Sequence, residues 1–287
     1  MLLRPPRQSL VPSNSTFISV NEAINPAAQR LALLVNLLTL PGRLINRRDF
    51  HSTLPTMQRT VLVIGANRGI GLNLARALAA RNWNVIASVR PQTIEMKDPS
   101  VEKIKAVASS ILEIDLTNQS TVANAAEKFG SQPLDVLINV AGLGPEPQMW
   151  YEHTSEILSE KFAVNTVGPF LTSKYFYPNL KTAKGSIINI SSNKGSMSEN
   201  NGEDLGYRLS KVALNMMTIT MAREFEEHGD NIAVVAINPG YVATRMTNYR
   251  SKNIMEECIA GIVEVVEGLD MTKTGTFINW NGETLPW

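Results

Sequence analysis

The chain of 287 residues carries 27 Lys and Arg against 26 Asp and Glu, a formal net charge of +1, and 44% of its residues are hydrophobic. This balance is typical of a globular protein and indicates neither a nucleic-acid partner nor attraction to an acidic membrane surface. The single cysteine excludes an intrachain disulfide, and three scattered histidines show no metal-ligand spacing, so we expect no metal site.

Residues 1–57 differ in composition from the rest of the chain. They contain six Arg, no Lys and two acidic residues, and their apolar run at 31–40 is far shorter than the roughly 20 residues of a membrane span. An Arg-rich, acid-poor leader is typical of a mitochondrial transit segment. A disordered leader, or translation from Met57, fits the same residues. Each interpretation places 1–57 outside the fold, and the expected location is cytoplasmic or mitochondrial.

From residue 58 onward, short β-branched runs alternate with helical patterns. The runs at 60–65, 84–89, 110–115 and 135–142 have the character of buried strands, and Thr117 is a candidate N-cap for one of the helices between them. Such alternation predicts βαβ units with right-handed crossovers. We therefore expect one α/β domain over 58–287, built on a single Rossmann-type doubly wound parallel sheet with helices on both faces.

The first strand is followed by a glycine-rich turn, VLVIGANRGIG at 61–71. Gly65 permits the tight turn, Gly69 lets the backbone approach a pyrophosphate, and Gly71 allows close helix packing. The helix that begins near Ile70 offers free N–H groups and a positive dipole to a phosphate. A lone glycine pattern is also typical of an ordinary turn, but its place between a strand and a helix predicts a nucleotide site.

Six motifs occur in the order in which the short-chain dehydrogenase/reductase family carries them. They are GANRGIG (65–71), NVAG (139–142), Asn165 in NTVG, Ser192 in GSIINISS, YRLSK (207–211) and NPGYVAT (238–244). The chain resembles this family over essentially all of 58–287. Within the family it is most similar to the carbonyl-reductase-like branch around the sniffer and C-factor proteins.

The resemblance implies an active site made of Asn165, Ser192, Tyr207 and Lys211. Tyr207 and Lys211 lie one helical turn apart and would face the same way. The phenol would give a proton to the developing alkoxide, while the ammonium would lower the phenol's pKa and hold the nicotinamide ribose. Ser192 would hydrogen-bond the carbonyl oxygen, with Ser191 as its rival. Asn165 would hold a water that links Lys211 to solvent.

Charge predicts the choice of cofactor. Members that select NAD usually place an acid at the end of the second strand, where it binds the ribose 2′-hydroxyl. This chain has Arg90 in that place and Arg68 inside the glycine turn. Two guanidinium groups favour a 2′-phosphate, so we expect NADP(H) rather than NAD(H).

The resemblance also implies the remaining cofactor contacts. Asp115 matches the family aspartate that contacts the adenine amino group, and Thr244 matches the residue that hydrogen-bonds the nicotinamide carboxamide. Four further residues complete the expected cofactor site: Asn139, Pro239, Gly240 and Val242.

The substrate pocket is expected to lie between three segments. Residues 149–151 (Met-Trp-Tyr) and the polar loop 193–206 would form two walls, and Tyr241 and Met246 would cover the third. Packing within the loop is an equal alternative for Met149 and Trp150. An apolar, aromatic pocket would suit an uncharged ketone, aldehyde or quinone.

These features predict an NADPH-dependent oxidoreductase that reduces a small carbonyl compound, with Tyr207 as the proton donor. A cofactor-binding signalling or regulatory protein of C-factor type is the alternative. The family also implies a homodimer or homotetramer formed through the helices at 154–180 and 205–228. Phe170, Tyr175 or Phe176 would then be buried against a partner.

Overall fold

The computed structural model describes residues 58–287, so the predictions for residues 1–57 lie outside the described residues. Seven parallel strands form one sheet in the order β3-β2-β1-β4-β5-β6-β7. The strands are β1 (Thr60–Ile64), β2 (Asn84–Val89), β3 (Ser110–Glu113), β4 (Val136–Asn139), β5 (Ser186–Ile190), β6 (Ala233–Asn238) and β7 (Phe277–Asn279). The order reverses between β1 and β4, and doubly wound sheets bind ligands at the carboxyl ends of the strands at such a point.

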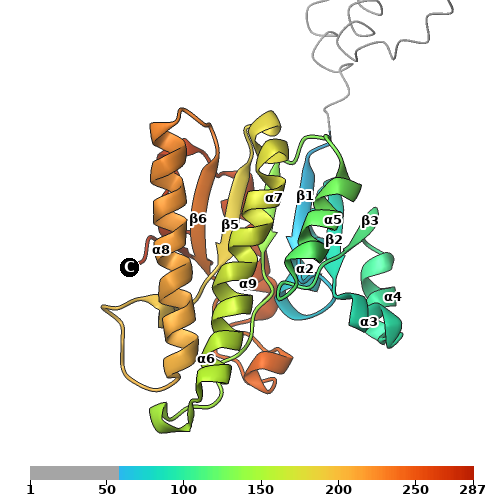
Figure 1. The fold of residues 1–287 in the computed structure, drawn as a ribbon. Helices are drawn as coiled ribbons and strands as arrows, with labels where there is room; N and C mark the ends of the chain where they lie inside the picture. The colour runs from blue at the N-terminus through green and yellow to red at the C-terminus, as the bar shows by residue number, and fades with distance from the viewer. Residues whose placement is uncertain (1–57) are drawn as a thin grey trace, which may run out of the picture. The chain divides into compact units, whose positions relative to one another are not determined.

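Helices cover both faces of the sheet (Figure 1). One face packs against α5 (Gln119–Phe129), α7 (Gly168–Ala183) and α8 (Leu205–Glu227), and the other against α2 (Gly69–Ala80) and α9 (Met255–Glu267). The shorter helices are α3 (Pro91–Glu95), α4 (Pro99–Lys105) and α6 (Ser155–Phe162). This arrangement confirms the expected Rossmann-type α/β fold.

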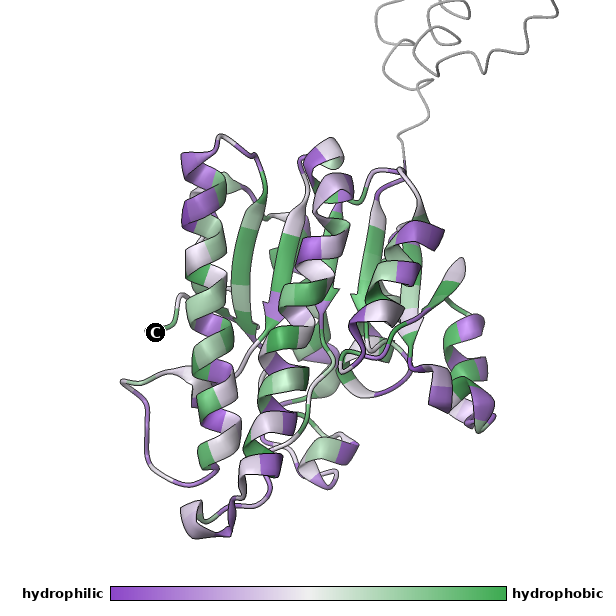
Figure 2. Cartoon of the chain, in the orientation of Figure 1, coloured by the Kyte–Doolittle hydropathy of each residue, from purple (hydrophilic) through white to green (hydrophobic). Residues whose placement is uncertain are grey.

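Side chains alternate between two separate cores along each strand. In β1, Val61 and Val63 join the core beneath α2 and α9, whereas Leu62 and Ile64 join the core beneath α5 and α7. Because successive side chains of a strand point to opposite faces, a strand buried on both faces is apolar along most of its length. Figure 2 shows strands that are mainly hydrophobic between helices with one hydrophilic side.

The structure corrects three local predictions from the sequence. β3 ends at Glu113 and β4 at Asn139, earlier than expected, because the following residues turn toward the sheet's ligand-binding edge. The N-cap of α5 is Asn118, whose side chain accepts a hydrogen bond from the Ser120 amide. Thr117 does not cap this helix, since its amide and hydroxyl both donate to the Asp115 carboxylate.

Phe176, one of the three aromatic residues that we expected at a subunit interface, is part of the core. Phe176 is fully buried within the chain and packs edge-to-face against Phe129, with ring centres 5.5 Å apart. Its position on α7 faces the sheet, so it is not free to meet a partner. Phe170 stays exposed on the same helix, and Tyr175 is half-buried with its hydroxyl accepting from Gln119.

Neither a membrane span nor a metal cluster is found among residues 58–287. No helix in this range is long and apolar enough to cross a bilayer. No group of three or more His, Cys, Asp or Glu side chains within it is arranged to hold a metal ion.

Candidate active site

A cleft of about 930 Å³ opens at the carboxyl ends of β1, β2 and β4. The glycine turn between β1 and α2 forms its floor. A Cβ added to Gly71 would lie 2.2 Å from the Gly65 carbonyl oxygen, and one on Gly65, whose φ is +82°, would lie 2.8 Å from the Cβ of Ala141. The backbone can therefore pack this closely only with glycine at both positions.

The N-terminus of α2 faces this cleft without a capping side chain. Its N-cap residue, Arg68, makes no side-chain cap hydrogen bond, and the first turn contains no acidic residue. Gly69 and Ile70 begin the helix and line the cleft, so unpaired amide groups and the positive end of the helix dipole face into it. This is the geometry that binds a phosphate group.

Cationic side chains gather at one end of the cleft. Arg68 and Arg90 both line it, and neither has a carboxylate within ion-pair distance anywhere in residues 58–287. Loss of hydration, followed by repulsion from Arg245 and Arg90, lowers the pKa of the Arg68 guanidinium. Asp98 also lines the cleft and partly offsets this repulsion, but guanidinium groups held together without an ion-pair partner still indicate a site for an anion.

Asp115 lines the same cleft just beyond the end of β3. Burial raises the pKa of its carboxyl, but hydrogen bonds from Thr117 and Gln92 outweigh burial and hold the pKa below its usual value. Gln92 donates to Asp115 Oδ2 at 3.1 Å. The carboxylate is therefore ionised and oriented, as a hydrogen-bond acceptor for a ligand must be.

Ser192, Tyr207 and Lys211 converge at the carboxyl end of β5. Tyr207 and Lys211 lie one turn apart on α8 and are 9% and 4% exposed. The Ser192 hydroxyl hydrogen-bonds the phenol of Tyr207, and Lys211 Nζ lies 5.7 Å from the centre of the Tyr207 ring. The structure thus brings together the three residues that the sequence placed in one site.

Burial is the main cause of the pKa shifts in this cluster. It lowers the pKa of Lys211, whose Nζ donates to the Ile190 carbonyl at 2.8 Å, to about 8. It raises the pKa of Tyr207 to about 12, with the Ser192 hydrogen bond opposing the shift and Asp204 adding to it. A protonated phenol is the form that a proton donor needs.

The two adjacent serines after β5 have different environments. Ser191 is buried, and its hydroxyl donates to Asn215 Oδ1 at 2.6 Å. The Ser192 hydroxyl instead accepts a hydrogen bond from the Lys194 amide, donates to Asn193 Oδ1 at 3.4 Å, and opposes the rise in the pKa of the nearby Tyr207 phenol. Since the Ser191 hydroxyl is engaged inside the core, the geometry favours Ser192 over its rival.

Asn165 lies in a π-helical turn, η2 (Ala163–Val167), between α6 and α7. Its buried amide accepts from the Leu143 amide at 2.7 Å and donates to the Leu143 carbonyl at 3.2 Å and to Ser210 Oγ at 3.0 Å. A Cβ on Gly142 would lie 3.2 Å from Asn165 Oδ1 and 3.9 Å from Lys211 Nζ. Asn165 therefore fixes the strand-end segment that passes in front of Lys211.

Some residues expected to bind the cofactor lie behind the cleft. Asn139 is buried, donates to Asn189 and accepts from Thr172, so its side chain is engaged within the fold. Gly240 packs against α9, where a Cβ would lie 2.9 Å from Cys258 Sγ. Pro239 and Val242 do not line the cavity either, whereas Thr244 does. Asn139, Pro239, Gly240 and Val242 therefore do not line the cleft.

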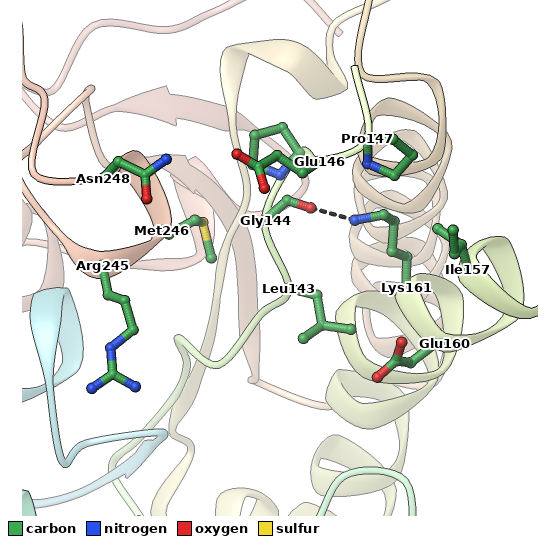
Figure 3. Close-up of a pocket in the computed structure, with 11 residues that line it drawn as sticks. Leu143, Gly144, Glu146, Pro147, Ile157, Glu160, Lys161, Arg245, Met246 and Asn248 are labelled. Carbon is green, nitrogen blue, oxygen red and sulfur yellow. Dashed lines mark hydrogen bonds between the residues drawn. The ribbon is translucent and has the colours of Figure 1, made fainter. Parts of the chain in front are cut away.

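A second cavity of about 340 Å³ adjoins the cleft and has a charged lining (Figure 3). Glu146, Glu160, Lys161 and Arg245 line it, and burial lowers the pKa of Lys161, whose Nζ donates to the Gly144 carbonyl. This cavity differs from the apolar, aromatic pocket that we expected for the substrate, since it has both apolar and charged residues in its lining. The charges come from the start of the 143–153 loop, from α6 and, for Arg245, from the segment after β6.

Most of the aromatic residues expected to wall the pocket point elsewhere. Of Met149, Trp150, Tyr151, Tyr241 and Met246, only Met246 lines either cavity. Trp150 and Tyr151 pack edge-to-face on each other, 5.9 Å apart, in the 3-10 turn η1 (Trp150–Glu152). Their contact fits the alternative of packing within the loop.

The loop between Ser192 and α8 is held by buried charges. Lys194 forms an ion pair with Asp204, whose carboxylate is 2% exposed and has one oxygen without a hydrogen-bond partner. Arg208 of α8 donates to the carbonyls of Gly202 and Glu203, at 3.0 Å each. These contacts fix the segment that carries Ser192 next to the phenol of Tyr207.

Comparison with known proteins places these features in context. The model of the short chain dehydrogenase family matches residues 59–254. The carbonyl reductase from chicken fatty liver, crystallised with NADPH bound, is 32% identical with a TM-score of 0.71, covering 80% of this chain and 99% of that one. The carbonyl reductase Sniffer of D. melanogaster is 28% identical with a TM-score of 0.72, covering 80% of this chain and all of that one.

A further sequence relative is C-signal of Myxococcus xanthus. It is 29% identical over 157 residues, which span 54% of this chain and 93% of C-signal. Together with Sniffer, it confirms the resemblance to the branch that the motifs indicated.

Proposed function

The chain belongs to the short chain dehydrogenase family, and on that premise we propose that it is an NADPH-dependent carbonyl reductase. The observation that carries the proposal is the convergence of Ser192, Tyr207 and Lys211, two of them buried, at the carboxyl end of β5. A protein that only bound a nucleotide would need neither a proton donor nor a hydroxyl aimed at it. These three groups are those that carbonyl reduction requires.

The cleft fits a phosphorylated dinucleotide. The glycine turn leaves no room for a Cβ at Gly71, the N-terminus of α2 is uncapped, and Arg68 and Arg90 face the cleft without acidic partners. A guanidinium pair favours a 2′-phosphate over a 2′-hydroxyl. We therefore assign NADP(H) in preference to NAD(H), with Asp115 at the adenine and Thr244 at the nicotinamide carboxamide.

The chain's own residues provide the proton chemistry of the reaction. NADPH, when bound, supplies a hydride to the carbonyl carbon. Ser192 donates a hydrogen bond to the carbonyl oxygen and orients it, and Tyr207 gives its phenolic proton to the oxygen as negative charge develops there. Lys211 stabilises the resulting phenolate and holds the nicotinamide ribose, and Asn165 supports the path by which Lys211 exchanges protons with solvent.

The substrate is a small ketone, aldehyde or quinone. Its reacting carbonyl lies at Ser192 and Tyr207, where burial excludes water. The neighbouring cavity presents two acids and two bases, Glu146 and Glu160 with Lys161 and Arg245. Because these charges balance, the cavity would accept polar substituents without selecting for a net charge on the substrate.

Turnover of a panel of ketones, aldehydes and quinones with NADPH tests this function. We expect NADPH consumption with at least one class and much slower consumption with NADH. The second candidate, a regulatory protein that binds the cofactor, is favoured by the similarity to C-signal. Tight NADPH binding without turnover of any class would support that candidate and contradict the reductase.

A homodimer or homotetramer is also part of the proposal. Phe162, Phe170, Leu209 and Met216 are between 45% and 63% exposed on α6, α7 and α8, and burial of such side chains against a partner would stabilise the assembly. Analytical ultracentrifugation at micromolar concentration measures the oligomeric state. A monomer under these conditions would contradict this part of the proposal without affecting the reductase.

A further inference from the structure

Arg245 begins a rigid 3-10 turn, η4 (Arg245–Thr247), that follows β6. The Thr247 hydroxyl donates to the Val242 carbonyl at 2.9 Å and accepts from the Thr244 amide at 3.0 Å. The Tyr249 amide donates to the Thr244 carbonyl at 2.8 Å. These bonds fix the backbone from which the Arg245 side chain projects.

This turn forms the wall of the cleft opposite the glycine turn. A Cβ added to Gly69 would lie 3.4 Å from Thr244 Cγ2, so the two segments are in contact range at the start of α2. Arg245 lines both the cleft and the smaller cavity beside it. In Figure 3 its guanidinium points away from Lys161 and Gly144.

Electrostatics place Arg245 near the other cations of the cleft. It lowers the pKa of Arg68 by repulsion and contributes to the lowered pKa of Asp98. Within residues 58–287, Arg245 has no carboxylate at ion-pair distance, like Arg68 and Arg90. Repulsion among three guanidinium groups is relieved when an anion binds between them.

We propose that Arg245 is a further cofactor-binding residue, which holds the pyrophosphate from the wall opposite the N-terminus of α2. The assignment rests on the proposed function, because it takes the ligand to be a dinucleotide. In such a ligand the pyrophosphate lies between the nicotinamide and adenosine halves. Arg245 occupies the matching place, since Thr244 beside it is assigned to the nicotinamide and Arg68 to the 2′-phosphate.

Two small ligands separate the two phosphate sites. ADP carries a pyrophosphate but no 2′-phosphate. Adenosine 2′-monophosphate carries a 2′-phosphate but no pyrophosphate. Arg245→Gln should weaken ADP binding by roughly tenfold or more, the loss expected for a charged hydrogen bond, and leave adenosine 2′-monophosphate nearly unchanged. It should also weaken NADPH and NADH by the same factor. Isothermal titration calorimetry measures all four affinities without catalysis.

Arg250→Gln is the matched control, because Arg250 is an exposed arginine of the same segment that lines neither cavity. Its affinities should equal those of the unaltered protein. An unchanged ADP affinity in Arg245→Gln would overturn the assignment, as would a loss confined to ligands with a 2′-phosphate. Failure of the reductase function would appear differently, as absent carbonyl turnover by the unaltered protein, whatever the ADP result.

Discussion

The two ends of the ligand-binding edge of the sheet are built in opposite ways. Around Tyr207 the functional groups are buried and already hydrogen-bonded to the protein, as in the contact of Lys211 with the Ile190 carbonyl. Around Arg68 and Arg90 the functional groups are exposed, have no carboxylate at ion-pair distance within residues 58–287, and repel one another. The first end is complete in the protein alone, whereas the second is completed by an anion.

This difference follows from what each end has to do. A proton donor must be held to a fraction of an ångström, so its neighbours are fixed before any substrate arrives. A phosphate site gains most of its affinity from charge, and charge acts over a distance with little need for exact geometry. Substitutions at the two ends should therefore affect different measurements.

Tyr207→Phe gives the largest expected effect and tests the preformed end. The ring remains and the cofactor cleft is untouched, but the proton donor is lost. Turnover should fall by roughly 10²–10⁴-fold, the contribution of a general acid, while the NADPH dissociation constant stays nearly unchanged. Steady-state kinetics and a fluorescence titration measure the two quantities.

Tyr175→Phe is the control for this variant, since the Tyr175 phenol bonds only Gln119 on the outside of α7. It should retain full turnover. Near-normal activity of Tyr207→Phe would remove that residue from its proposed role.

The double variant Arg68→Gln, Arg90→Gln tests the end that needs an anion. Each charged contact contributes about 1.5–3 kcal/mol, but removal of one guanidinium also relieves repulsion on the other. We therefore expect NADPH affinity to fall by roughly 10–100-fold, and NADH affinity by much less. Equal losses for both cofactors would show that these arginines do not bind the 2′-phosphate.

Arg76→Gln is the matched control for the double variant. Arg76 is an exposed arginine of α2 that does not line the cleft. Its substitution should leave the affinity for both cofactors unchanged.

The titration of Lys211 tests the preformed end through stability, without any ligand. Its pKa in the folded protein is about 8, below the ordinary lysine value of 10.5, so the unfolded chain binds more protons between these values. The free energy of unfolding should therefore rise with pH across this interval, by a contribution on the order of 3 kcal/mol. Below pH 8 Lys211 is charged in both the folded and the unfolded state. Its contribution to the free energy of unfolding therefore does not change with pH there.

Lys211→Met should remove this contribution, which chemical denaturation at several pH values would measure. The same slope in the variant and the unaltered protein would show that Lys211 is not the titrating group. The variant should also lose turnover and NADPH affinity, because the ammonium is proposed to serve both.

The fold and the preformed site were largely predictable from the sequence. The alternation of β-branched runs with helical patterns predicted the doubly wound sheet, and the resemblance to the family predicted that Ser192, Tyr207 and Lys211 share one site. Tyr207 and Lys211 lie one turn apart on α8 and Ser192 follows β5, so local structure brings them close. The resemblance already favoured Ser192 over Ser191, and the structure adds that the Ser191 hydroxyl donates to Asn215.

The lining of the cavities was less predictable because it is assembled by distant segments. Glu146, Lys161 and Arg245 meet only when the 143–153 loop, α6 and η4 come together. A third arginine directly after Thr244 was the available signal, but a single cation after a motif is more often a solvated surface charge. For residues 149–151 the sequence left two interpretations open, and the contact of Trp150 with Tyr151 fits packing within the loop.

The π-helical turn at Ala163–Val167 has a consequence for how the chain can vary. A wide turn sets the phase of α7 relative to α6, and each residue of a regular helix advances the phase by about 100°. Deletion of one residue there would let regular winding resume, and the widened turn that holds Asn165 against Leu143 and Ser210 would be lost. Many single substitutions at Val164 or Val167 would be tolerated by comparison. In natural variants of this stretch, the number of residues should therefore vary less than their identity.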